Sequence, residues 1–152
     1  DEGISEQLDS LIKIHRLNNQ SLKLEITESA MMSDSSLSTK NMRKLHDMGF
    51  NIVIDDFGTG LSSLFKLKEL PISELKIDKA FITNITNDKK DAAIAKAAIQ
   101  LAQSLDMKVV AEGIEDEKTW HYLKEIGCDY GQGFWMAKPM PINELINWIK
   151  KR

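Results

Sequence analysis

The stretch that decides the fold is Ile52-Val53-Ile54-Asp55-Asp56-Phe57-Gly58-Thr59-Gly60. Its three β-branched apolar residues predict a buried strand, and two carboxylates follow where that strand ends. The two glycines permit positive φ angles and a tight turn, and Ser62 or Ser63 could cap a short helix beyond it. An apolar strand that ends in charged residues and leads into a helix is the repeating unit of parallel α/β folds.

The same unit recurs on both sides of this stretch. Strands are expected at Leu22–Thr27, Asn51–Asp55, Glu74–Asp78, Lys108–Glu112 and Cys128–Gly131. Helical patterns lie at Ile4–His15, Leu37–Met48, Lys89–Leu105, Glu117–Ile126 and Ile142–Lys150, with Ser36 and Asp88 as candidate N-caps. Strand and helix alternate through five units, so the sequence predicts an α/β fold with a parallel sheet.

Length and composition exclude several classes of protein. The chain has 152 residues, of which 42% are apolar, and it carries 20 basic against 23 acidic residues, a net charge of −3. These values fit one globular domain and argue against a protein that coats nucleic acid. No unbroken apolar run approaches the roughly 20 residues of a membrane span. A single cysteine, Cys128, cannot form an internal disulfide, which favours a reducing, cytoplasmic location.

Ionisable or polar side chains gather near the carboxyl ends of the expected strands. They are Glu25 with Glu28, Asp55 with Asp56, Lys76 with Asp78, Glu112 with Glu115, and Asp129 with Gln132. Any one of these could simply cap a helix or pair with a neighbouring lysine. In parallel α/β folds, however, the carboxyl ends of the strands form the ligand-binding face. The whole set therefore predicts a site.

The adjacent pair Asp55-Asp56 predicts the chemistry of that site. Two neighbouring carboxylates repel each other and are usually balanced by a cation. Because side chains alternate along a strand, we expect one aspartate to point toward the sheet centre and the other to lean outward. Oxygen ligands select hard cations such as Mg²⁺ or Mn²⁺, and a pair of such ions clamps the oxygens of a phosphoryl displacement. The glycine-rich loop is not a Walker A loop, because the Gly-Lys-Ser/Thr ending is missing.

Taken together, these segments resemble the EAL-domain cyclic-di-GMP phosphodiesterases. The motifs that carry the resemblance are Glu25-Ile26-Thr27-Glu28, Asp55-Asp56-Phe57-Gly58-Thr59-Gly60 with Ser62-Ser63-Leu64, Leu75-Lys76-Ile77-Asp78, Ala111-Glu112-Gly113-Ile114-Glu115, Gln132-Gly133 and Lys138-Pro139-Met140. They occur in the family's order and cover the chain from about Leu22 to Trp148. Position 61 departs from the pattern, because it is leucine where members often carry an aromatic residue.

The resemblance implies a role for each of these side chains. It implies metal ligation by Glu25, Asp55, Asp56 and Glu112, with Asp55 bridging two Mg²⁺ or Mn²⁺ ions. Lys76 would position the attacking water, and Glu112 would complete the second metal site or act as the base. Glu28 would anchor the loop after Asp56, and Gln132 would contact the substrate or the water. Asp78 and Glu115 are interpreted as structural residues.

The resemblance also implies a partial TIM-like (β/α) barrel. The family's barrel has eight strand-helix units, and residues 1–152 resemble the C-terminal five, without the strands that carry the Glu-Ala-Leu motif and a metal-binding asparagine. We expect this chain not to close the barrel and to associate with itself through the open edge. A longer parent protein could also be anchored to a membrane through its preceding regions.

The implied activity is hydrolysis of cyclic-di-GMP to linear pGpG by water that two metal ions activate, in bacterial second-messenger signalling. The resemblance assigns this activity to the parent, and we expect the isolated chain to be inactive or weakly active. One alternative is a non-catalytic module that binds cyclic-di-GMP or a protein partner. Another is a flavodoxin-like receiver domain, but a receiver has its acidic pair after the first strand and its lysine after the fifth.

Overall fold

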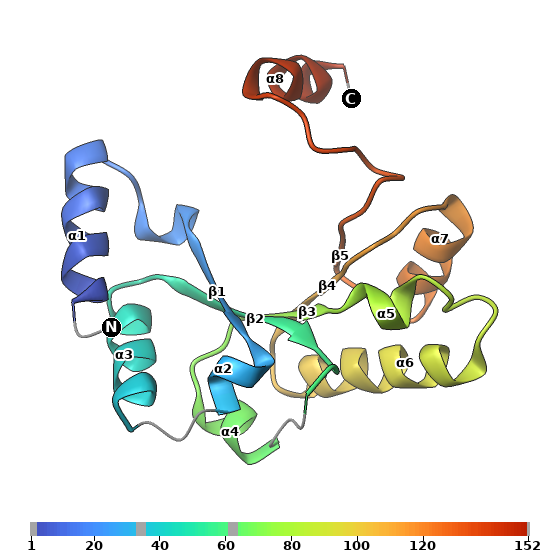
Figure 1. Cartoon of the computed structure of the whole chain (residues 1–152), viewed down its shortest axis with the longest axis horizontal. Helices are drawn as coiled ribbons and strands as arrows, with labels where there is room; N and C mark the ends of the chain where they lie inside the picture. Colours follow the sequence, from blue (N-terminus) through green and yellow to red (C-terminus); the bar gives the residue numbers. More distant parts are fainter. Residues whose placement is uncertain (1–2, 33–35, 61–63, 152) are drawn as a thin grey trace.

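Five parallel strands in one open sheet form the centre of the molecule, in the order β1-β2-β3-β4-β5 (Figure 1). The computed structural model describes residues 3–32, 36–60 and 64–151. The strands are β1 (Lys23–Thr27), β2 (Asn51–Phe57), β3 (Glu74–Ile77), β4 (Lys108–Ala111) and β5 (Tyr130–Gly131). The five parallel units expected from the sequence are therefore confirmed.

Helices precede, separate and follow these strands. They are α1 (Ile4–His15), α2 (Glu28–Met32), α3 (Ser36–Asp47), α4 (Leu64–Glu69), α5 (Lys79–Ile82), α6 (Lys89–Ser104), α7 (Glu117–Glu125) and α8 (Ile142–Lys150), with a short 3₁₀ turn at Asn19–Ser21. Of the described helices, none is both long enough and apolar enough to cross a membrane.

The two faces of the sheet differ in polarity because side chains alternate along each strand. On one face, Ile54, Leu75 and Val109 are fully buried and pack in the main core, to which α6 contributes Ala95 and Ile99. In Figure 1 helices α2, α3, α4 and α6 lie on this side of the sheet, whereas α8 stands apart on the other side. The opposite face carries charged side chains, and we call it the polar face; it includes Lys23, Glu25, Glu74 and Lys76.

The strand order excludes the flavodoxin-like alternative. Strand neighbours in the sheet are also neighbours in sequence. A flavodoxin-like sheet has the order 2-1-3-4-5, because its chain reverses direction across the sheet after the first units. Sequential order in one direction is the arrangement of an arc of a parallel barrel, and here the arc stays open.

Most of the expected elements have nearly the expected bounds. Helices α1 and α8 begin and end where the sequence predicts them, and Asp88 caps α6 by accepting hydrogen bonds from Lys90 N and Asp91 N. The candidate cap Ser36 is instead the first residue of α3. The short helices α2 and α5 were not expected, whereas α4 lies where a short helix was expected after the glycine loop. Ser62, Ser63 and the family variation at Leu61 lie outside the described residues.

Candidate metal centre

A bulge in β2 brings both aspartates to the same side of the sheet. Ile54 pairs with Leu75 and Phe57 pairs with Ile77, so β2 uses three residue steps where β3 uses two. Asp56 takes up the extra residue with φ of 56°, a left-handed conformation that aspartate tolerates better than most residues. The alternation expected from the sequence, with one aspartate inward and one outward, is interrupted here because a bulge shifts the pleat by one residue.

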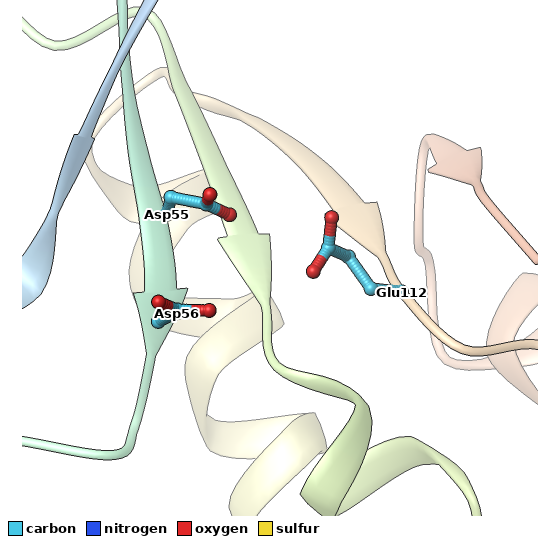
Figure 2. A group of neighbouring side chains, drawn as sticks. All are labelled: Asp55, Asp56 and Glu112. Carbon is cyan, nitrogen blue, oxygen red and sulfur yellow. The ribbon is translucent and has the colours of Figure 1, made fainter.

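Glu112 faces this pair across β3. It follows β4 directly, and its backbone N–H donates to the carbonyl of Ile77 at 3.1 Å. Figure 2 shows the carboxylates of Asp55, Asp56 and Glu112 turned toward one another. Each of the three offers one oxygen, and these oxygens lie within 4.8 Å of one another. The three side chains thus form a compact carboxylate group at the carboxyl ends of β2 and β4.

Lys76 supplies the balancing positive charge from β3. Its Nζ lies 2.8 Å from Glu112 Oε1, 3.0 Å from Asp55 Oδ1 and 3.1 Å from Glu25 Oε2. Burial by itself would lower the pKa of Lys76, but the contacts with Glu112, Asp55 and Glu25 outweigh it and raise the pKa above its usual value. Lys76 is therefore charged at neutral pH and joins residues from three other strands or strand ends.

The carboxylate group fits a hard divalent cation. Asp55 Oδ1 is buried, and its polar neighbour is the Lys76 ammonium at 3.0 Å. A carboxylate oxygen can accept from more than one direction, so contact with a single ammonium leaves room for a metal cation. The donors are oxygens only, the type that Mg²⁺, Mn²⁺ and Ca²⁺ prefer. The three histidines lie in helices α1, α3 and α7, away from this group.

Glu25 and Glu28 lie at the end of β1, in different surroundings. Glu25 is half exposed and reaches the group through its hydrogen bond from Lys76. Glu28 is almost fully buried, and its Oε2 accepts hydrogen bonds from the backbone N–H groups of Gly58 at 2.8 Å and Gly60 at 3.2 Å. Glu28 thus holds the backbone of the glycine loop that follows Asp56.

Gln132 follows β5 and borders two hollows on the site. One hollow, of about 340 Å³, lies on the polar face and also contains Glu25 and Lys76. The other, of about 290 Å³, is lined by Glu112, Lys79 and Phe134 as well. The Gln132 carbonyl accepts a hydrogen bond from Ile114 N at 3.1 Å, so the segment after β5 is tied to the turn that carries Glu112.

The predicted ligands, Lys76, Glu28 and Gln132 all reach this end of the sheet, but the expectation for Asp129 was wrong. Asp129 precedes β5, and its Oδ1 lies 2.6 Å from Nζ of Lys108, the first residue of β4, so it belongs to the amino ends of the strands.

Two neighbours of the site, Lys79 and Phe81, were missed. Asp78 was interpreted as structural, and its Oδ1 accepts a hydrogen bond from Ala80 N at 2.8 Å as the N-cap of α5. That helix places Lys79 and Phe81 against the two turns that carry the carboxylates. The sequence around Lys79 and Phe81 contains no signal that they lie beside the site, because a single helical turn is too short to show a helical periodicity.

Known proteins resemble this chain in sequence and in fold. The EAL domain profile matches residues 1–139. A relative from Pseudomonas aeruginosa, the bifunctional diguanylate cyclase/cyclic di-GMP phosphodiesterase MucR, is 44% identical over 95% of this chain, which spans only 21% of that protein. The structure of the P. aeruginosa MucR phosphodiesterase in complex with c-di-GMP has a TM-score of 0.90 and 44% identity, over 94% of this chain and 58% of the other.

A more distant structure was solved with a metal. Klebsiella pneumoniae BlrP1, in a complex with manganese and cyclic-di-GMP, matches with a TM-score of 0.79 and 28% identity, over 88% of this chain and 34% of the other. The motifs, the sheet and these matches agree along nearly the whole sequence. The chain belongs to the EAL domain family.

Proposed function

We propose that this chain carries the metal-binding and catalytic part of a phosphodiesterase site that hydrolyses cyclic-di-GMP to linear pGpG. The observation that carries the proposal is the carboxylate group Asp55, Asp56 and Glu112 with Lys76 among its neighbours. The MucR structure in complex with c-di-GMP supports the choice of substrate, and the manganese complex of BlrP1 supports a divalent cation.

The cations would be Mg²⁺ or Mn²⁺, two in the complete domain. Asp55, Asp56 and Glu112 would hold one through the oxygens that already converge, and Glu25 would join Asp55 in holding the other. A bound divalent cation supplies the Lewis acidity that makes water a nucleophile near neutral pH and offsets the charge of the phosphate.

Other side chains of the site would act on the water, the substrate and the glycine loop. The ammonium of Lys76 would orient the attacking water and stabilise the negative charge that builds on the phosphate oxygens. Glu112 would complete the metal site or accept the proton of the water. Gln132 would contact the substrate from the hollow it borders, and Glu28 would keep the Asp56 loop in place through Gly58 and Gly60.

We further propose that residues 1–152 are the C-terminal part of an EAL domain and that the chain associates with itself. The order of the motifs supports the first point. Apolar side chains exposed on α1 and α8 support the second, among them Ile14 at 72% and Ile142 at 66% exposure. In the described sheet β1 and β5 have one strand neighbour each, so both present an open edge.

The test is hydrolysis by this chain and by one matched pair of variants. The chain is incubated with cyclic-di-GMP and Mn²⁺ or Mg²⁺, pGpG is followed by chromatography, and binding is measured by calorimetry. Loss of an outer partner of a metal ligand typically costs ~10–100-fold in activity. Asp55→Asn changes a proposed ligand itself, so it should lower turnover by more than that. Asp106→Asn is the control, because it makes the same change at an exposed turn residue that precedes β4, away from the carboxylate group.

The outcomes separate the candidate functions. Metal-dependent turnover that Asp55→Asn abolishes supports the phosphodiesterase, completed by this chain in its associated state. Binding of cyclic-di-GMP without turnover would favour the non-catalytic regulatory module instead. Turnover that survives both chelation and Asp55→Asn would contradict the proposed site.

A further inference from the structure

Helix α5 lies between the two backbone turns that carry the carboxylate group. The chain leaves β3 after Lys76 and Ile77, caps α5 with Asp78, and forms one helical turn at Lys79–Ile82. In Figure 2 this segment descends from β3 between Asp56 on one side and Glu112 on the other. The N–H of Asp78 also donates to the carbonyl of Phe57 at 3.4 Å, which links the start of α5 to the end of β2.

On one side, the ring of Phe81 packs against the loop that follows Asp56. A Cβ on Gly58 would lie 2.7 Å from Cε2 of Phe81, closer than real Cβ contacts come. Gly58 has φ of 102°, which also favours glycine. Its N–H donates to Glu28, so the loop is held by a carboxylate at one surface and by an aromatic ring at the other.

On the other side, Lys79 packs against the turn that follows Glu112. A Cβ on Gly113 would lie 2.5 Å from the Cβ of Lys79 and 3.3 Å from its Cα. Gly113 has φ of 72°. Gly58 and Gly113 therefore leave no room for a Cβ where α5 contacts them. Phe81 makes the contact with Gly58, and Lys79 makes the contact with Gly113.

We propose that α5, a single helical turn, is a spacer that sets the distance between Asp56 and Glu112, with Phe81 and Lys79 as positioning residues. The two carboxylates come from β2 and from the end of β4, and both strands pair with β3. This pairing sets the spacing of the strands, but the β2 ladder is interrupted between Ile54 and Phe57, so it does not set the position of Asp56. The close-packed segment between the two turns does set it, because packed side chains and backbone have little room to yield. The proposal rests on the proposed metal site.

The experiment compares Phe81→Ala, Phe81→Leu and Tyr122→Ala in the full chain. Tyr122 is the matched control, since it is a partly buried aromatic residue that packs on the same core from α7. Amide resonances of the metal-free proteins report the positions of Gly58, Gly60 and Glu112, and Mn²⁺ titration followed by electron paramagnetic resonance reports affinity. Thermal unfolding of each variant measures the purely structural cost.

Phe81→Ala should shift the amide resonances of Gly58 and Gly60 and raise the Mn²⁺ dissociation constant by ~10-fold or more, as loss of outer support for a metal ligand does. Phe81→Leu keeps part of the contact and should raise the dissociation constant by a smaller but measurable factor, so it also serves if Phe81→Ala does not fold. Tyr122→Ala should leave the Gly58 and Gly60 resonances and the Mn²⁺ dissociation constant unchanged, although it should lower the stability of the protein as much as Phe81→Ala does.

Two results would overturn the spacer. One is wild-type Mn²⁺ affinity in a folded Phe81 variant, and the other is an unchanged Gly58 resonance in that variant. A wild-type chain that binds no Mn²⁺ would instead count against the proposed metal site, and the metal-free resonances of Gly58 and Glu112 would still decide whether α5 positions the two turns.

Discussion

Lys76 is the residue on which the charge balance of the site depends. Its side chain is 9% exposed, and three carboxylates lie within 3.1 Å of its Nζ. Lys76→Met leaves those carboxylates without their cation in metal-free buffer. We expect a loss of about 1–3 kcal/mol in the free energy of unfolding, below the ~3–5 kcal/mol for breaking a wholly buried pair because Glu25 remains half exposed. Urea unfolding measures this loss.

The control is Lys108→Met, which removes the exposed partner of Asp129 and should change stability little. Alkaline pH supplies a second measurement. Because the pKa of Lys76 is raised in the native protein, its stabilising effect is complete below the ordinary lysine pKa of ~10.4 and falls as pH rises through the native pKa. Above pH ~10.4 wild-type stability should fall more steeply than that of Lys76→Met, by up to ~1.4 kcal/mol per pH unit. Equal slopes would contradict the raised pKa.

Residue positions at this site were predictable to different degrees. Glu25, Lys76 and Glu112 reach one face because parallel strands place their carboxyl ends together, and the sequence alone predicts that. The direction of Asp56 was not predictable. It depends on a bulge in the pairing of β2 with β3, which is a property of two segments brought together.

At the level of elements, α6 tests whether stability and site geometry can be separated. Ile99 is fully buried against the core, whereas Ile94 in the same helix is 42% exposed. Ile99→Ala should lower the free energy of unfolding by about 2–5 kcal/mol, because it leaves a cavity, and Ile94→Ala should cost much less. Thermal and urea unfolding measure both variants.

Mn²⁺ affinity of folded Ile99→Ala should stay at the wild-type value, since α6 packs on the opposite face of the sheet from Lys76. A large loss of affinity at temperatures where the variant is folded would contradict this separation. It would mean that the core packing of β3 and β4 positions the carboxylates.

The elements themselves divide by length into predictable and unpredictable ones. α1 has twelve residues, enough for its apolar period to mark both ends. α5 has four, and its existence depends on the Asp78 cap and on packing against the turns at Gly58 and Gly113. Short elements of this kind form because of tertiary contacts, which no local pattern contains.

At the scale of the whole molecule, the open sheet could be predicted from the count of five strand-helix units. The sheet edges and the exposed apolar side chains of α8 are then expected to be covered by association with another copy of the chain. On α8, Ile142, Ile146 and Ile149 are spaced by four and three residues, and all are exposed. Such a stripe on a helix face commonly packs against another surface. We therefore expect the chain to dimerise or associate further at ~50 µM, a concentration at which contacts of about 6 kcal/mol are occupied.

Light scattering coupled to size-exclusion chromatography measures that association. A double variant, Ile142→Glu with Ile149→Glu, should shift the chain toward the monomer, because two charges would have to be desolvated in the contact. Asn147→Glu adds a charge to the polar side of the same helix and should leave the mass unchanged. A monomeric wild-type chain at ~50 µM with well-protected amides would contradict this expectation, because it would mean that an open sheet with an exposed α8 is stable by itself. Any turnover would then have to come from the residues of one chain alone.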